Sequence, residues 1–333
     1  MFGPLIFLIF INDITNNTSS TARLFADDCV LYRTINCEAD AIKLQKDQGT
    51  MEQWEAKWLK EFNLDQCEIV TVANKMPYVN YPNNTHAKEL AHAQHAKYLG
   101  LTCSNNFRWN THIDNIGKKA NVTCAFLSRS MNSCLRQVNA QCFTTLVLPK
   151  MEYAATVWDP YIEFNINTLE KCQCRAARFV NGDYSSESSA TSMLKKLKYP
   201  PLQQRRTNTK MVMMYRIIHH LIAIPSQMYL TSATIRITRG HAQQCSMPFS
   251  RISSHQYSYY PSAIRTWNSL PAVLITVPTL RAFKWRWLMY MCRHSYHNFY
   301  CKYYIFDMCF LSHASVSANV HSTSSIILRT TEG

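Results

Sequence analysis

Residues 21–33 read TARLFADDCVLYR, two short apolar runs that meet at an adjacent pair of carboxylates, Asp27 and Asp28. The flanking residues suit a pleated, half-buried surface, which predicts two strands joined by a turn. Two acids side by side in an apolar setting repel each other and lose solvation unless a positive charge lies nearby. A divalent metal would stabilise them, because Mg²⁺ prefers hard oxygen ligands. A surface turn that happens to contain two aspartates is the simpler alternative.

Composition and charge indicate the class of partner. The 333 residues are 47% hydrophobic, enough for a sizeable core, and a chain of this length holds about two domains. The 35 basic and 21 acidic residues give a net charge of +14. This balance favours a polyanionic partner, because Lys and Arg neutralise phosphates. A basic protein whose charge only keeps it soluble is the alternative.

The cysteine content and the amino-terminal residues indicate the cellular compartment that the chain suits. The 13 cysteines are an odd number without a repeated spacing, which is typical of reduced thiols inside the cell, in cytoplasm or nucleus, rather than of a secreted disulfide scaffold. The apolar run Pro4–Ile11 is too short to cross a bilayer, which takes about 20 residues. It also lacks the basic flank and cleavage site of a signal peptide. We therefore expect no membrane partner. We expect Pro4–Ile11 to be a helix or strand buried in a domain interior.

Further segments stand in a defined order along the chain. Gly3-Pro4-Leu5-Ile6-Phe7 precedes Phe25-Ala26-Asp27-Asp28, and Lys97-Tyr98-Leu99-Gly100 follows it. The later segments are Glu152-Tyr153-Ala154, Val157-Trp158-Asp159-Pro160, Arg175-Ala176-Ala177-Arg178-Phe179 and Trp267-Asn268-Ser269-Leu270-Pro271. In this order, from Gly3 to about Phe283, they resemble the reverse transcriptases of jockey-like non-LTR (LINE-type) retrotransposons.

The resemblance implies RNA-directed DNA synthesis by two-metal nucleotidyl transfer. Asp27 and Asp28 match the Asp-Asp box of the family and would be catalytic ligands of Mg²⁺, with Mn²⁺ as the alternative ion. An RNA template and a DNA primer would be the partners. Lys97, Tyr98, Leu99 and Gly100 would position the primer's 3′ end, through backbone and Tyr98 contacts rather than base readout. An ordinary strand turn is the alternative for this segment.

Two features argue against polymerase activity in this chain alone. In the family a further aspartate comes from a strand upstream of Met1, together with the fingers, and Met1 itself stands at an internal position. We therefore expect a carboxy-terminal fragment with half of its metal site. Gln66 stands where the family usually has a lysine that protonates pyrophosphate, and an amide has no dissociable proton of suitable pKa.

The expected fold is α+β: a partial reverse-transcriptase palm, in which a β-hairpin carries Asp-Asp, followed by mostly helical regions. The expected parts are a partial palm (1–95), a primer-grip-like hairpin (96–114), a helical thumb-like region (115–223), a family-specific region that contains Trp-Asn-Ser-Leu-Pro, treated as structural (224–283), and a divergent tail that is disordered at its Ser/Thr-rich end (284–333).

Two helices carry most of the periodic signal. Over 39–62, the spacing of Met51, Trp54, Trp58 and Phe62 places them on one buried face. Over 166–180, an apolar stripe opposes a basic face formed by Lys171, Arg175 and Arg178. That basic face could bind nucleic acid or simply be solvated. Other helices are expected at 115–130, 138–153, 192–198 and 202–222.

The function of the chain therefore has three readings. It is a piece of a reverse transcriptase that is inactive by itself, a basic nucleic-acid-binding remnant without chemistry, or a decayed transposon reading frame. Primer extension separates the first from the others. Salt-dependent binding separates the second from the third, because a charge-driven complex weakens steeply with salt.

Overall fold

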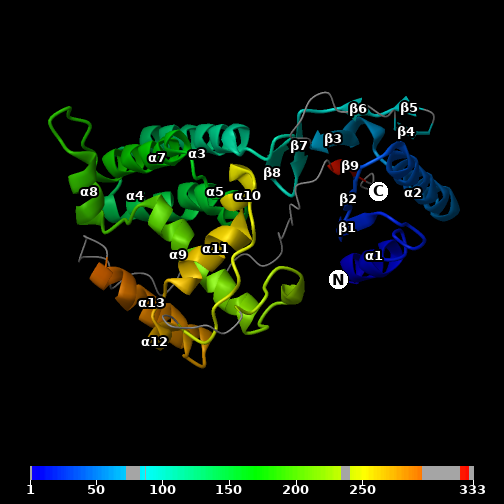
Figure 1. The fold of residues 1–333 in the computed structure, drawn as a ribbon. Helices are drawn as coiled ribbons and strands as arrows, with labels where there is room; N and C mark the ends of the chain where they lie inside the picture. The colour runs from blue at the N-terminus through cyan, green and yellow to red at the C-terminus, as the bar shows by residue number, and fades with distance from the viewer. Residues whose placement is uncertain (1, 73–82, 87, 234–240, 295–322, 330–333) are drawn as a thin grey trace. The chain divides into compact units, whose positions relative to one another are not determined.

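The structure is a computed structural model that describes residues 2–72, 83–86, 88–233, 241–294 and 323–329. It mixes helices and small sheets, as an α+β chain should (Figure 1). The chain forms two compact units: unit 1 comprises Met1–His112 with Asn319–Gly333, and unit 2 comprises Ile113–Ala318. We describe each unit by itself.

The centre of unit 1 is a five-stranded sheet in the order β1-β2-β9-β3-β6. Its strands are β1 (Thr21–Phe25), β2 (Asp28–Thr34), β3 (Glu68–Val72), β6 (Ala91–His92) and β9 (Thr323–Arg329). β1 and β2 form the hairpin that the sequence predicted, with Phe25 paired to Asp28. β9 runs antiparallel to both β2 and β3. Of the tail 284–333, residues 295–322 and 330–333 lie outside the described part of the chain, and residues 323–329 form this strand in the middle of the sheet.

One face of this sheet packs on α2 (Glu38–Trp58). Cys29 and Leu31 of β2 and Ile69 of β3 share a buried cluster with Leu44 and Met51 of α2. Such a cluster needs an apolar stripe at helical spacing, which α2 supplies.

The end of α2 differs from the sequence expectation in two ways. The helix ends at Trp58, because Leu59 adopts a left-handed conformation with φ 55°. Phe62 is buried, but it lies beyond the helix. Trp58 is 41% exposed, with an edge contact to the ring of Phe10 and a tilted contact to the ring of Trp54. The 3-10 turn η1 (Leu64–Gln66) then leads to β3.

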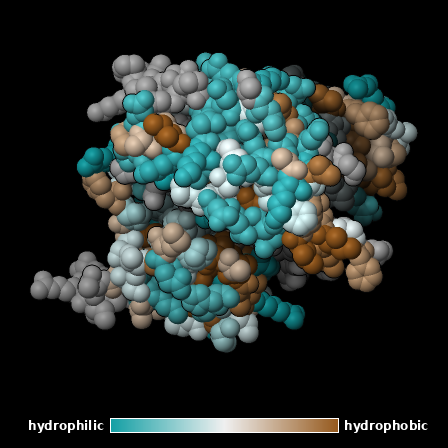
Figure 2. Space-filling model, turned by 90° about the vertical axis from the view of Figure 1, so that its right-hand side faces the viewer, coloured by the Kyte–Doolittle hydropathy of each residue, from teal (hydrophilic) through white to brown (hydrophobic). Residues whose placement is uncertain are grey.

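Helix α1 (Gly3–Ile11) was expected to be buried, and that expectation is wrong for most of the helix. Ile11 is buried, but Leu5, Ile6 and Ile9 are exposed by 59%, 62% and 78%. The reason is that α1 is apolar on all sides, while only one side packs on Trp54 and its neighbours. Figure 2, which colours one face of the molecule by hydropathy, shows hydrophobic surface in brown among the hydrophilic teal. Within the described residues, no helix combines the length and the apolar character needed to span a bilayer.

Two small hairpins complete unit 1. β4 (Asn84–Thr85) pairs with β5 (Lys88–Glu89), and β7 (His95–Tyr98) pairs with β8 (Leu101–Ser104). The β7–β8 hairpin covers the second face of the sheet, where Ala96 and Tyr98 pack with Val30, Val70 and Val72. Apolar clusters therefore lie on both faces of β2 and β3.

Unit 2 is helical in the described residues, including the region 115–223 that the sequence predicted to be helical. Its comparison with a polymerase thumb stays a prediction. The helices are α3 (Asn110–Ser130), which begins in unit 1, then α4 (Arg136–Cys142), the π-helical segment η2 (Phe143–Val147), α5 (Leu148–Glu152), α6 (Ala155–Trp158), α7 (Glu163–Asn181), α8 (Ala190–Leu197), α9 (Leu202–Ile218), η3 (Ser226–Met228), α10 (Ser253–Gln256), α11 (Tyr259–Asn268), α12 (Ala272–Ile275) and α13 (Leu280–His294).

The Trp-Asn-Ser-Leu-Pro segment is part of the core of unit 2. Trp267 is fully buried in a cluster with Met211, Tyr215 and Phe283. The side chain of Asn268 accepts from the backbone N–H of Cys245 at 3.0 Å and donates to its carbonyl oxygen at 2.7 Å. These contacts give the segment the structural role that the sequence suggested.

Candidate functional site

Asp27 and Asp28 lie at the turn of the β1–β2 hairpin. Two residues, Ala26 and Asp27, connect the paired Phe25 and Asp28, and Ala26 takes the left-handed conformation with φ 50°. Both carboxylates are half-buried. Directly after them, burial raises the pKa of the Cys29 thiol to about 12, with smaller contributions from Cys67 and Asp28. The acids therefore stand at the turn where β2 begins, and the buried thiol next to them stays protonated.

The start of the hairpin is held by Asp47, a buried acid on α2. Its carboxylate accepts from the backbone N–H of Ser19 at 2.9 Å, from that of Ser20 at 2.7 Å and from the Ser19 hydroxyl at 3.0 Å. Burial alone would raise the pKa of Asp47, but these hydrogen bonds outweigh it and hold the pKa below 3.8. Asp47 thereby connects the first residues of β1 to α2.

Sequence reasoning missed Asp47, although a signal was present. It lies between Leu44 and Met51 on the apolar face of α2, where an acid is out of place unless it is paired. An acid inside an apolar stripe indicates a buried hydrogen-bonded carboxylate.

The structure brings Tyr98 close to Asp28. Burial, and after it the negative charge of Asp28, raises the pKa of Tyr98 to about 12. The phenol is therefore neutral at ordinary pH and can donate a hydrogen bond. Two predicted site residues that are far apart in the sequence thus lie in one neighbourhood of unit 1.

The tip of the β7–β8 hairpin is a two-residue turn formed by Leu99 and Gly100. Their φ angles are 47° and 79°, and positive φ at both central positions is the geometry of a type I′ hairpin turn. Glycine adopts it without strain, whereas leucine does not. Lys97 and Gly100 are exposed. The turn thus presents backbone groups to solvent next to Tyr98.

The basic face predicted on the helix near 166–180 belongs to α7, in unit 2. The apolar stripe of that helix, which includes Leu169 and Ala176, is buried as predicted. Lys171 and Arg175 are exposed. Arg178 is half-buried and donates to the carbonyl oxygens of Ser185 at 2.8 Å and Ser188 at 3.3 Å. Arg178 therefore makes structural hydrogen bonds within unit 2. Of the three residues, Lys171 and Arg175 are the exposed ones.

A second group of charges, whose members the sequence shows but whose pairing it did not predict, lies inside unit 2. Asp159, of the Val-Trp-Asp-Pro segment, accepts from Arg206 Nε at 2.9 Å and from Lys210 Nζ at 2.6 Å. Lys210 also donates to the Ser262 hydroxyl at 2.7 Å. The Arg206 side chain is 1% exposed. These contacts connect α6, α9 and α11, so the aspartate of this segment has a structural role.

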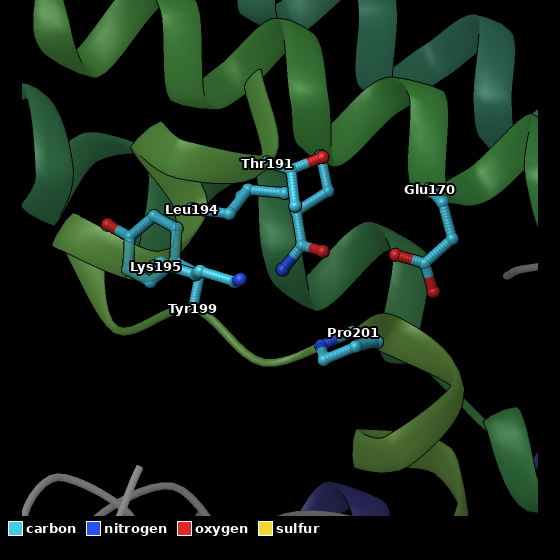
Figure 3. Close-up of a pocket in the computed structure, with 7 residues that line it drawn as sticks. Glu170, Thr191, Leu194, Lys195, Tyr199 and Pro201 are labelled. Carbon is cyan, nitrogen blue, oxygen red and sulfur yellow. The ribbon is translucent and has the colours of Figure 1, made fainter. Parts of the chain in front are cut away.

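A small cavity of about 70 Å³ lies between α7 and α8 (Figure 3). Buried Gln173 lines it, and its Oε1 atom has no hydrogen-bond partner among the described residues. A water molecule takes about 30 Å³ of liquid volume, so the cavity suits about two waters. It is too small for a nucleotide. The other lining residues are Glu170, Thr191, Leu194, Lys195, Tyr199 and Pro201.

Comparison with known proteins agrees with the ordered motifs. The chain is 25% identical over 199 residues to the RNA-directed DNA polymerase from mobile element jockey of Drosophila melanogaster, across 55% of this chain and 21% of that protein. It is 23% identical over 197 residues to the probable RNA-directed DNA polymerase from transposon BS of the same species, across 54% of this chain and 21% of that protein. The chain matches part of a jockey-like reverse transcriptase. It spans about a fifth of the length of these relatives. No family model and no solved structure matches it.

In this jockey-like sequence, the described residues do not complete a metal centre. Within the part of the chain that the structure describes, no group of three or more His, Cys, Asp or Glu residues is placed to hold a metal ion. Asp13, the other early acid, accepts a hydrogen bond from Trp54 Nε1 at 2.6 Å. Asp27 and Asp28 alone do not supply the carboxylate set that a pair of bridged metal ions requires.

Proposed function

We propose that this chain is a piece of the RNA-directed DNA polymerase of a non-LTR retrotransposon. Asp27 and Asp28 are two of the carboxylates that bind Mg²⁺ or Mn²⁺ at the primer terminus, and the chain does not synthesise DNA by itself. The observation that carries the proposal is the approach of the Tyr98 hairpin to the Asp28 turn within unit 1. An acid pair beside a neutral phenol and an exposed turn suits the end of a nucleic-acid strand.

Each residue of this group has a defined task. Asp27 and Asp28 provide oxygen ligands for a hard cation. Tyr98, protonated because its pKa is about 12, donates a hydrogen bond to a sugar or phosphate oxygen of the primer. Lys97 is exposed and supplies a charge for the adjoining phosphate. The Leu99-Gly100 turn lets the primer backbone approach closely, since glycine carries no side chain.

Two features of the described residues support the proposed absence of activity. The two acids have no third carboxylate beside them in the described part of the chain. Gln66 closes the turn η1 and carries an amide, which cannot act as a general acid. Neither deficit removes the nucleic-acid contacts proposed for Lys97 and Tyr98.

Primer extension tests the proposal. The chain is incubated with Mg²⁺ on a poly(A)/oligo(dT) template-primer, beside the chain that carries Asp27→Asn and Asp28→Asn. We expect no extension from either protein. Extension by the unsubstituted chain that disappears in the double variant would mean that the metal site is complete here, and would overturn the proposed inactivity.

The second candidate function is nucleic-acid binding without chemistry, favoured by the net charge of +14 and by exposed Lys171 and Arg175 on one face of α7. Duplex binding is measured as a function of salt for the variant Lys171→Gln/Arg175→Gln. The matched control is Lys195→Gln/Lys196→Gln, which removes the same charge from α8. If α7 contacts two phosphates, the slope of log K against log salt falls by about 2 in the first variant only.

The remaining outcomes are equally informative. Equal slopes in both variants would show that α7 has no special role. No binding at low salt by the unsubstituted chain would favour a decayed reading frame.

A further inference from the structure

The strand β9 has an unusual place in the sheet of unit 1. It comes from the last residues of the chain, yet it lies between β2 and β3 (Figure 1). Residues 28–34 of β2 pair with 329–323, and residues 68–72 of β3 pair with 327–323. Because β9 is antiparallel to both, β2 and β3 run parallel to each other with one strand position between them.

That position is lined by apolar residues on both faces. Leu31 of β2 and Ile69 of β3 belong to the cluster that packs on α2. Val30 of β2 and Val70 of β3 belong to the cluster under the β7–β8 hairpin. Without a strand between them, β2 and β3 would leave backbone N–H and C=O groups unpaired in a buried setting, which is costly. The position therefore suits an extended chain, and Ile326-Ile327-Leu328 in β9 has the composition of such a strand.

The register of β9 bears directly on the acid pair. Arg329 pairs with Asp28 on one side, and Phe25 pairs with Asp28 on the other. Directly opposite residues are the nearest cross-strand neighbours in an antiparallel pair. On the β9 side, position 329 is the backbone position directly opposite Asp28, so a carboxylate there would be the nearest that β9 could supply. β9, which reads TSSIILR, contains no acid.

We infer that the position between β2 and β3 is a strand-binding groove that this chain closes with its own carboxy-terminal strand. By filling the groove, β9 keeps a third carboxylate away from Asp28. The inference rests on the proposed function for the meaning of Asp28, whereas the occupation of the groove is independent of any catalysis.

Hydrogen exchange tests the occupation in the full chain. Proline in a central strand removes ladder hydrogen bonds, so Ile327→Pro should release β9. The control is Thr331→Pro, two residues beyond β9. In Ile327→Pro we expect the amides of β2 and β3 to exchange at least about tenfold faster, while the helices of unit 2 keep their protection. Equal protection of β2 and β3 in both variants would overturn the inference.

Peptide rescue covers the case in which Ile327→Pro unfolds all of unit 1. The free peptide of residues 323–329 is added in excess to that variant, beside the same peptide with proline at the position of Ile327. Recovered protection of β2 and β3 with the first peptide alone supports a strand-binding groove. No recovery with either peptide contradicts it.

A second pair of variants tests the link to the acids. Arg329→Asp places a carboxylate in register with Asp28, and Arg329→Asn only removes the cation. We expect Arg329→Asp to bind Mn²⁺, followed by its paramagnetic resonance signal, at least about tenfold more tightly than Arg329→Asn. Adding Asp28→Asn to Arg329→Asp should abolish that gain.

Equal Mn²⁺ affinities would refute the link between β9 and the acids. Neither the exchange nor the Mn²⁺ readout depends on primer extension or duplex binding, so failure of the proposed function would be seen separately.

Discussion

Hydrogen-bonded carboxylates connect elements within each unit of this chain. Asp47 holds the first residues of β1 against α2, and Asp159 holds α9 through Arg206 and Lys210. Each of these carboxylates is satisfied by several donors, which is the condition under which an acid is tolerated in a core. Asp28 lies in the sheet of unit 1, in register with Phe25 on β1 and with Arg329 on β9.

Removing Asp159 should be costly. In Asp159→Ala, the buried cations Arg206 and Lys210 lose their shared counter-ion, and breaking a buried pair from one side destabilises by about 3–5 kcal/mol. The control is Asp65→Ala, whose partner Lys88 and own side chain are 57% and 90% exposed. That control should change stability by less than about 1 kcal/mol. Urea unfolding followed by circular dichroism measures both, and equal effects would contradict the buried cluster.

Acid should reveal the contribution of Asp47. Its pKa in the folded chain lies below the ordinary 3.8, so its stabilising effect is present above that value and is lost as pH falls through the folded pKa. The stability difference between the chain and Asp47→Asn should therefore shrink between about pH 5 and pH 2. Glu38→Gln, at an exposed acid of the same helix, is the control. A difference that does not change with pH would argue against the Ser19 and Ser20 hydrogen bonds.

At the scale of elements, a single residue in the left-handed conformation ends each of two helices. The periodicity of 39–62 predicted a helix through Phe62, but α2 ends where Leu59 takes φ 55°. Helix α7 ends in the same way at Gly182, with φ 63°. Leucine pays a steric cost in this conformation that glycine does not.

Substitutions at these two C-cap residues should change stability in opposite directions. Leu59 is 92% exposed, so Leu59→Gly removes strain without removing packing and should stabilise unit 1 by about 1 kcal/mol. Gly182→Ala should destabilise unit 2 by about 1 kcal/mol, since a Cβ at this position meets no atom within 4 Å and only the backbone strain remains. Denaturant midpoints measure both. The same sign for the two variants would refute the cap argument.

At the scale of the whole molecule, the chain has separate buried cores. Met51 belongs to the core of unit 1 and Met214 to that of unit 2, and both side chains are fully buried. A chain with separate cores need not unfold in a single transition.

Core truncation should therefore act on one unit at a time. Met51→Ala should cost about 2–5 kcal/mol and speed amide exchange in β2 and β3 while α9 keeps its protection. Met214→Ala should do the reverse. Hydrogen exchange of both variants at the same temperature gives the comparison, and loss of protection across both units in either variant would show that they unfold together.

The sequence by itself determined much of the local secondary structure and the resemblance to a known family. Residues suited to a pleated, buried surface around Asp27 and Asp28 predicted the β1–β2 hairpin, and apolar residues at helical spacing predicted α7 and most of α2. The order of the motifs predicted the jockey-like resemblance that the comparisons bear out. These signals are local, because the repeats of a strand and of a helix are contained within a few neighbouring residues.

Only the tertiary structure decided which distant residues meet. It brings Tyr98 to Asp28, Ser19 to Asp47 and Asp159 to Lys210. It also places β9, from a tail expected to be disordered, between β2 and β3. Such pairings leave no periodic mark in the sequence. They follow from burying apolar faces and satisfying buried polar groups over the whole unit, which a short window of residues does not contain.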